Sequence, residues 1–367
     1  MIDKGKISAR QLVMLMYLMI GATSTLIVPA ITARQAAQDM WLSPIWGSLS
    51  GFVIVGITWA LYKLYPNESI IQYAVSIVGR YIGKMSGLFI LFFLLHGTGM
   101  ILREYGEFVA SAFLTRTPLI TITLSLIVVC AFAVRSGIEV LARCTQIFLP
   151  FIALVFVCIF SMLIPDMDAR KMLPMLEGGL FPSIKGSIVP HTWFIEFFFI
   201  TFLFPAVSDN AKGFKAGMLA VFFMTLVMVA TNFASLFVFG GITGFLSFPV
   251  YYAASYISFG SFLEHLDAIV MVTWILGGFV QISLWYYSLV IGSAQWLGLS
   301  NYRFLVFPMG LLCGIFSVWV TPSLQELIHF FYTSAPFYSF TLLFLYPLAL
   351  LCIAWVRRTT KNKNSSL

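Results

Sequence analysis

The chain has 367 residues, of which 60% are hydrophobic and only 10% are charged, and its mean hydropathy is +0.96. Soluble domains are about half apolar and about one quarter charged, so this composition excludes an ordinary soluble protein and predicts a membrane protein. The net charge of +7 comes from Lys and Arg in short segments between apolar runs. That distribution argues against a nucleic-acid partner, which requires a basic surface patch, and favours the lipid bilayer as the surrounding medium.

No motif for soluble enzyme chemistry is present. The five cysteines lie in apolar stretches without a Cys-x-x-Cys pair or a nearby histidine, so neither a disulfide framework nor a metal site is expected. The sequence also has no phosphate-binding glycine loop and no nucleophile elbow. We therefore expect no catalytic residues, no metal and no cofactor.

Ten apolar segments are long enough to cross the roughly 30 Å of hydrocarbon as α-helices. In chain order, the predicted spans are residues 11–33, 44–64, 85–112, 118–135, 140–164, 187–206, 215–241, 266–296, 303–321 and 337–356. Short surface helices are expected at 68–78 and 249–259. The fold class is therefore an all-α membrane protein with about ten transmembrane helices.

The distribution of positive charge predicts the orientation. With the N-terminus in the cytoplasm, most Lys and Arg side chains fall on the cytoplasmic side. Those on the opposite side are Arg34, Arg103, Arg116, Arg170, Lys171 and Lys185. This asymmetry predicts cytoplasmic N- and C-termini and an even number of spans.

A division of ten spans into five and five places the two halves in opposite orientations, as in a large class of transporters. We expect one membrane domain over 1–367, with repeats at about 8–164 and 184–357 and a polar tail at 358–367. In such folds the first helix of each half is broken near the midplane, where free backbone groups hold the ligand.

The first span contains a run of small and hydroxyl-bearing residues, Gly21-Ala22-Thr23-Ser24-Thr25, followed by Pro29. We expect a break in the helix here. The alternative is a continuous helix whose small residues allow close packing. The sixth span, with Gly186, Pro190 and Pro205, carries a weaker signal for a break, because proline alone can merely kink a helix.

Ionisable and amide side chains inside the membrane are candidates for function, because their desolvation must be offset. Glu196 is the acidic residue predicted to lie within the hydrocarbon, where it could contact a ligand amine, carry a proton or be satisfied structurally. His96 and Gly97 lie halfway along the third span, and Gln281 lies one turn before Trp285 in the eighth. A satisfied core histidine and an interhelical hydrogen bond are the structural alternatives for His96 and Gln281.

Charged residues near the ends of the spans have structural interpretations. Glu139 and Arg143 are four residues apart at the inner end of the fifth span, so we expect an ion pair that acts as a latch. Arg103, Glu104 and Glu107 lie toward the outer end of the third span, where a solvated helix end is favoured over a guarded vestibule.

Several segments together resemble one known family. They are IGATSTLIVP from Ile20, GIEVLARCTQIFLP from Gly137, LPMLEGGLFPSIKG from Leu173, the cluster around Trp193 and Glu196, and FLEHLDAIVMVTWI from Phe262. The chain resembles the B subunits of bacterial spore nutrient-germinant receptors over nearly its whole length. That family belongs to the amino acid, polyamine and organocation transporter superfamily, which implies two inverted five-helix repeats with helices one and six broken.

The resemblance implies a germinant-sensing subunit of the spore inner membrane that works with an A subunit and a lipoprotein C subunit. It implies a nutrient site between helices one, three, six and eight. The matching positions are Ala22, Thr23, Ser24, Phe93, His96, Gly97, Trp193, Glu196, Gln281 and Trp285. Relatives often have Gly-x-Gly at the break, where this chain has Ala22 and Ser24.

Two functions remain open from the sequence. A sensor binds a small nutrient, with an amino acid expected, and passes a change of shape to partner subunits. An ion-coupled amino acid permease needs a coupling-ion site, yet no lysine lies in the middle of the fifth span and no acidic residue lies in the first. That absence favours the sensor, with residual transport or ion conduction still open.

Overall fold

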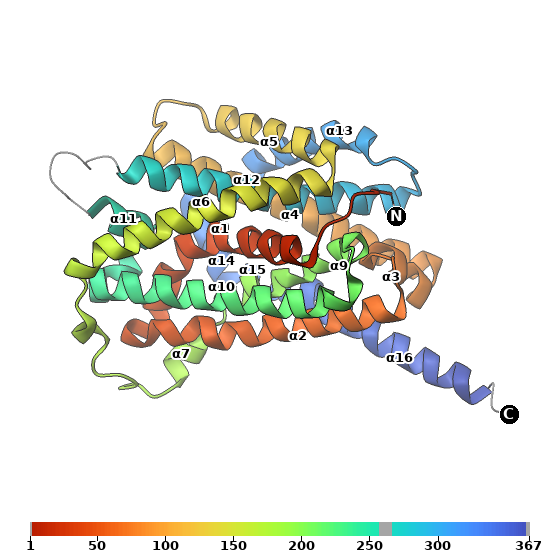
Figure 1. The fold of residues 1–367 in the computed structure, drawn as a ribbon, viewed down its shortest axis with the longest axis horizontal. Coiled ribbons are helices and arrows are strands. Elements are labelled where there is room, and N and C mark those ends of the chain that lie inside the picture. The colour runs from red at the N-terminus through yellow and green to blue at the C-terminus, as the bar shows by residue number, and fades with distance from the viewer. Residues whose placement is uncertain (1, 257–265, 365–367) are drawn as a thin grey trace.

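The computed structural model describes residues 2–256 and 266–364, and in that part of the chain nearly every residue lies in a helix or a tight turn. Long helices run along the long axis of the molecule, and both termini lie at the same end (Figure 1). The long helices are α1 (Ala9–Ala36), α2 (Ser43–Leu64), α4 (Arg80–Ala112), α5 (Leu119–Ser136), α6 (Ile138–Leu163), α10 (Asn210–Phe239), α12 (Leu266–Leu297), α13 (Arg303–Trp319) and α16 (Tyr346–Asn364).

Shorter helices connect these long ones. They are α3 (Ile70–Val78), α7 (Phe181–Gly186), α8 (Pro190–Ile195), α9 (Ile200–Leu203), α11 (Pro249–Tyr256), α14 (Leu324–Thr333) and α15 (Ala335–Ser339). The short helix expected at 68–78 is present as α3, whose apolar face is buried. The helix expected at 249–259 is α11, and its last three predicted residues lie outside the described part. The polar tail is helical up to Asn364, because α16 continues past the predicted end of the last span.

The all-α membrane architecture is confirmed. Among the described residues, seven helical stretches are long and apolar enough to cross a membrane, or eight if the bent pair α13 and α14 counts as one span. The first of these stretches, Ala9–Leu64, contains α1 and α2, which run in opposite directions (Figure 1). A helical segment is present at each of the ten predicted spans, while the number of crossings and the inverted repeats remain predictions.

The predicted break in the first span is wrong. The helix α1 continues without interruption from Ala9 to Ala36, with Pro29 inside it. The Thr25 hydroxyl donates to the Gly21 carbonyl at 2.7 Å, so the hydroxyl-bearing run satisfies helix carbonyls rather than freeing them. A side chain added at Gly277 of α12 would lie 3.1 Å from Ala22 Cβ, so the small residues serve close helix packing.

The sixth span, in contrast, is not a regular helix. The α-helical turns α8 and α9 are separated by a 3-10 turn, η4 (Glu196–Phe199), and the segment ends in another 3-10 turn, η5 (Phe204–Ala206). Pro190 begins α8, where its missing N–H costs nothing, and Pro205 lies in the terminal turn. The change of winding at η4 sets the direction in which the Glu196 side chain leaves the backbone.

The N-terminal segment is tied to the same end of the bundle. Ile7 pairs with the end of the sixth segment, donating to the Ala206 carbonyl at 2.9 Å. The Asp3 carboxylate accepts hydrogen bonds from the Ile138 amide at the start of α6 and from the Tyr287 hydroxyl of α12, both at 3.1 Å. This segment therefore joins α1, α6, α12 and the sixth segment.

The expected ion pair between Glu139 and Arg143 forms, with 3.9 Å between the guanidinium nitrogen and the carboxylate oxygen. Both side chains are exposed to the outside of the protein. Glu139 also accepts a hydrogen bond from the Lys6 amide at 2.8 Å, so it latches the N-terminal segment to α6. An exposed ion pair contributes at most about 1 kcal/mol, so the backbone contact is the more specific part of the latch.

Candidate ligand-binding site

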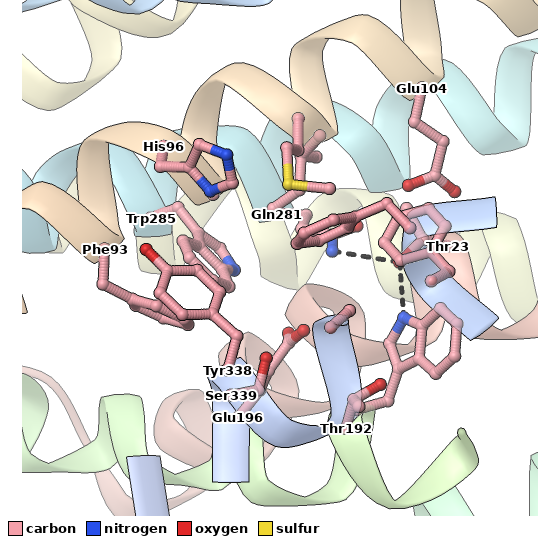
Figure 2. A pocket seen from close by; sticks show the side chains of 17 residues that line it. Thr23, Phe93, His96, Glu104, Thr192, Glu196, Gln281, Trp285, Tyr338 and Ser339 are labelled. Carbon is pink, nitrogen blue, oxygen red and sulfur yellow. Dashed lines mark hydrogen bonds between the residues drawn. The ribbon is translucent and has the colours of Figure 1, made fainter. Parts of the chain in front are cut away.

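A cavity of about 60 Å³ lies between α1, α4, the sixth segment, α12 and the α14–α15 segment. Figure 2 shows side chains from all five elements pointing toward it. It is lined by Thr23, Phe93, His96, Gly97, Met100, Ile101, Glu104, Thr192, Trp193, Glu196, Gln281, Trp285, Phe330, Phe331, Ala335, Tyr338 and Ser339. Eight of the ten residues predicted as ligand-binding are in this lining, and the other two are Ala22 and Ser24.

The continuous α1 explains why Ala22 and Ser24 are not in the lining. Successive residues of an α-helix point about 100° apart, so only one of three neighbours can face a given cavity. That residue is Thr23. Ala22 lies on the side toward Gly277, and Ser24 is fully buried. An unwound backbone would have allowed all three to face the cavity.

Thr23 joins two walls of the cavity. Its hydroxyl oxygen accepts a hydrogen bond from the Trp193 indole at 2.9 Å and another from the Gln281 amide at 3.1 Å, as the dashed lines in Figure 2 show. Trp193 comes from α8 and Gln281 from α12. One hydroxyl on α1 thus fixes the positions of two neighbouring segments.

Replacing Thr23 with valine should therefore destabilise the protein. Valine keeps the shape but leaves the Trp193 and Gln281 donors buried without an acceptor, at a cost of about 1–3 kcal/mol. We expect a lower midpoint of thermal unfolding for Thr23→Val in detergent. Thr23→Ser retains the oxygen and should behave like the wild type. Equal midpoints of thermal unfolding for Thr23→Val and the wild type would show that the two hydrogen bonds contribute nothing to stability.

The contribution of α4 follows helical spacing. Phe93, Gly97, Met100 and Glu104 recur every three or four residues and therefore share one face of the helix. Gly97 leaves no open space on this face, because a Cβ there would overlap the Trp285 ring. The glycine instead allows the indole to approach the α4 backbone.

Glu104 also differs from its predicted setting. A solvated helix end was favoured for the acidic cluster of α4, but Glu104 is only 2% exposed and its carboxylate borders the cavity. Neighbouring Arg103, 6% exposed, is also buried. The expectation is wrong because α14 packs against α4 and covers this region.

Several polar atoms around the cavity have no hydrogen-bond partner within the described part of the chain. They are His96 Nδ1, Glu104 Oε1, Glu196 Oε2, Gln281 Oε1, Trp285 Nε1 and Tyr338 OH. Buried polar groups are nearly always paired, because an unpaired one costs about 1–3 kcal/mol. Six such atoms around one cavity are typical of a binding site. No group of three or more His, Cys, Asp or Glu among the described residues is arranged to hold a metal ion.

The wall formed by α14 and α15 was not predicted. These two helices bring Phe330, Phe331, Tyr338 and Ser339 to the cavity. The sequence contains one signal for α14: Ser323 precedes Glu326 by three residues, a helix-start pattern, and the Ser323 hydroxyl accepts from the Glu326 amide at 3.3 Å. The bend of 95° between α13 and α14, which turns α14 across the bundle, has no comparable sequence signal.

Arg103 holds this bend in place. Its guanidinium pairs with Glu107 at 2.7 Å and donates to the Pro322 carbonyl at 3.1 Å, between α13 and α14. At the other side, the Arg34 guanidinium lies 5.3 Å from the centre of the Tyr332 ring of α14. Two cationic side chains therefore fix α14 over the cavity.

We expect the Arg103→Gln variant to loosen α14. The change removes a buried ion pair and hydrogen bonds to the bend, and charged hydrogen bonds contribute about 1.5–3 kcal/mol each. Hydrogen–deuterium exchange of segment 318–333 should become faster, while that of α2 stays unchanged. Arg116→Gln, at an exposed loop position, is the matched control. Unchanged exchange in Arg103→Gln would contradict a holding role for this residue.

Comparisons with known proteins agree with this architecture. Residues 6–325 match the model of the Spore_permease family, described as "Spore germination protein", and the chain belongs to this family. The chain is 29% identical to spore germination protein KB of Bacillus subtilis (strain 168), over 99% of this chain and 98% of that protein. It is 24% identical to spore germination protein XB of Bacillus anthracis, over 93% and 96% of the two chains.

Solved structures with the same fold are transporters. A Na⁺-coupled sialic acid symporter superposes with a TM-score of 0.66 and 11% identity, covering 93% of this chain and 79% of the symporter. Mhp1, a nucleobase-cation-symport-1 family transporter, superposes with a TM-score of 0.61 and 10% identity, covering 89% of this chain and 75% of Mhp1. The fold is therefore that of LeuT-type transporters, and the relatives are germination proteins and permease-like proteins rather than enzymes.

Proposed function

We propose that this chain is the germinant-binding B subunit of a spore nutrient receptor, and that its ligand is a small amino acid. The family membership supports the receptor role. The observation that carries the ligand-binding proposal is the set of unpaired polar atoms around one aromatic-walled cavity. Since α1 is continuous, side chains rather than free backbone groups form this site.

The charges of the lining favour a ligand with an ammonium group. Two carboxylates, Glu104 and Glu196, border the cavity, and its lining contains no lysine or arginine. An ammonium group between them would offset their charge and donate to the free Oε2 of Glu196. The free His96 Nδ1 and Tyr338 hydroxyl lie in the same lining and are available to the carboxylate of an amino acid. Phe93, Trp193 and Trp285 surround the remaining volume.

The size of the cavity links binding to a change of shape. A volume of about 60 Å³ holds only a few water molecules, because each needs about 10–15 Å³. An amino acid with more than about six non-hydrogen atoms is larger than this space, so the walls must separate when it enters. The α14–α15 segment is the wall that two cationic contacts hold from outside the cavity. A ligand that binds better to the expanded form shifts the protein toward that form, which is the signal we propose.

We also propose a topology, a membrane location and partner subunits for the chain. Both termini lie at one end of the bundle, in agreement with two cytoplasmic termini (Figure 1). The proposed location is the spore inner membrane, and the proposed partners are an A subunit and a lipoprotein C subunit. The two inverted repeats, at about 8–164 and 184–357, are retained as part of the proposal.

Two assays separate the sensor from an ion-coupled permease. The first measures uptake of radiolabelled amino acids by vesicles that contain the purified protein, with and without a proton or sodium gradient. The second measures the germination of spores that lack the protein in response to the same amino acids. A sensor predicts lost germination and no gradient-driven uptake. Gradient-driven uptake with intact germination would establish the permease instead.

A further inference from the structure

A second, apolar hollow lies on the outer surface of the bundle between α6 and α10. It has a volume of about 430 Å³. Its lining residues are Tyr17, Ile152, Ala153, Phe156, Val157, Phe160, Ser161, Ile164, Met167, Val227, Ala230 and Thr231. None of these side chains carries a charge. We call this hollow the α6–α10 groove.

The groove continues inward as a narrow extension of about 30 Å³. The two share Tyr17, Ile152, Phe156 and Val227 in their linings. At its inner end the extension reaches Gly21, Ala22 and Thr25 of α1 and Thr273, Trp274 and Gly277 of α12. Thr23, one residue after Ala22, faces the ligand-binding cavity on a different side of α1. The groove thus leads from the surface of the protein to the face of α1 formed by Gly21, Ala22 and Thr25, which we call the back of α1.

The groove opens toward the hydrocarbon of the membrane. It lies along α6, which has the lowest buried share among the candidate spans, at 22%. The apolar lining residues Val157 and Ile164 are 63% and 65% exposed on the outer surface of the protein. Within a bilayer, the medium in contact with such a surface is lipid acyl chains.

The chemistry of the lining favours an acyl chain over a transmembrane helix of another protein. Helices associate in lipid through close contacts of small residues and interhelical hydrogen bonds. The serine and threonine hydroxyls here already donate to carbonyls of their own helices, with Thr231 bonded to Met228 at 3.0 Å and Ser161 to Val157 at 2.7 Å. A helix is about 10–12 Å wide and cannot enter the narrow extension. The extension, at about 30 Å³, has room for about two or three water-sized groups, which suits the terminal carbons of a single acyl chain.

We propose that the α6–α10 groove binds one acyl chain of a membrane phospholipid, with the end of the chain inserted against the back of α1. The inner hollow is lined mainly by apolar surface, and hollows of that kind accept apolar guests rather than water. Van der Waals contact with the aromatic side chains of Phe156 and Phe160 would hold the chain. This inference does not depend on which nutrient the other cavity binds.

Photoactivatable phospholipids test the proposal in lipid nanodiscs that contain the full chain. One lipid carries a diazirine at the middle of its acyl chain and another carries it at the end, and mass spectrometry locates the adducts. The mid-chain probe should label 152–160 and 227–231. The terminal probe should label the inner residues 21–25 and 273–277, which a chain remaining on the surface cannot reach.

A double variant, Ala153→Phe with Ala230→Phe, should fill the groove and abolish labelling of the inner residues. The matched control is Leu154→Phe with Leu226→Phe, which changes exposed positions of the same helices outside the groove lining and should leave labelling unchanged. Uniform labelling of all lipid-facing helices, without adducts on residues 21–25 and 273–277, would overturn the proposal. Loss of groove labelling in native spore membranes, with labelling retained in nanodiscs, would show a protein occupant and also overturn it.

Discussion

The Glu196→Gln variant is expected to bind amino acids about 10- to 150-fold more weakly than the wild type, because a hydrogen bond to a charged group contributes about 1.5–3 kcal/mol. The substitution keeps the shape of the side chain and removes the charge that would face the ligand ammonium. Binding is measured as stabilisation of the purified protein against heat by a panel of amino acids, since a ligand that binds the folded state raises its stability.

Two controls make this result specific. Glu177→Gln removes a carboxylate from an exposed position and should leave binding unchanged. The N-acetyl derivative of the best amino acid lacks the ammonium group and should fail to stabilise even the wild type. If Glu196→Gln responds like the wild type at every amino acid concentration, Glu196 has a structural role and the ammonium contact is wrong.

The Gly97→Ala variant tests the packing of the cavity wall. The new methyl carbon would overlap the Trp285 ring, which cannot retreat easily toward Phe199 because that side chain packs on it with ring centres 4.3 Å apart. Overpacking of this kind costs about 1–3 kcal/mol when the indole is held in place. In the free protein the indole can move into the cavity, whereas a bound ligand holds it against the new methyl group, so the cost falls on binding and we expect a roughly 5- to 150-fold rise in the amino acid concentration needed for germination.

A matched glycine provides the control for this experiment. A Cβ at Gly56 of α2 would have no atom within 4 Å, so Gly56→Ala adds the same methyl group to a helix without a clash. Its germination response should equal that of the wild type. A normal dose response in Gly97→Ala spores, at normal protein abundance, would remove α4 and the Trp285 ring from the site.

The predicted site residues that line the cavity are those placed by helical spacing or marked by their polarity. Gln281 and Trp285 are four residues apart, and Phe93 and Gly97 are also four apart, so each pair occupies one face of a regular helix. Polarity was the second useful signal, since Glu196 in an apolar segment does border the cavity. Both signals are local properties of the chain and do not depend on the tertiary packing around it.

The errors arose where tertiary contacts decide the outcome. Small residues in α1 suit both a broken helix and a closely packed one, and Gly277 of α12 faces Ala22 in the packed form. The role of Glu104 and the wall formed by Phe330 and Tyr338 depend on the 95° bend between α13 and α14. Arg103 fixes that bend through residues more than two hundred positions away in the sequence, which spacing cannot reveal.

A structure of the protein with the amino acid that stabilises it most tests the central claim most directly. We expect density for that amino acid among Thr23, Glu196 and Trp285, with the ligand nitrogen within hydrogen-bond distance of the Glu196 carboxylate and with α14 displaced outward. Ligand density at any other place, with this cavity unchanged, would show that the proposed site is wrong.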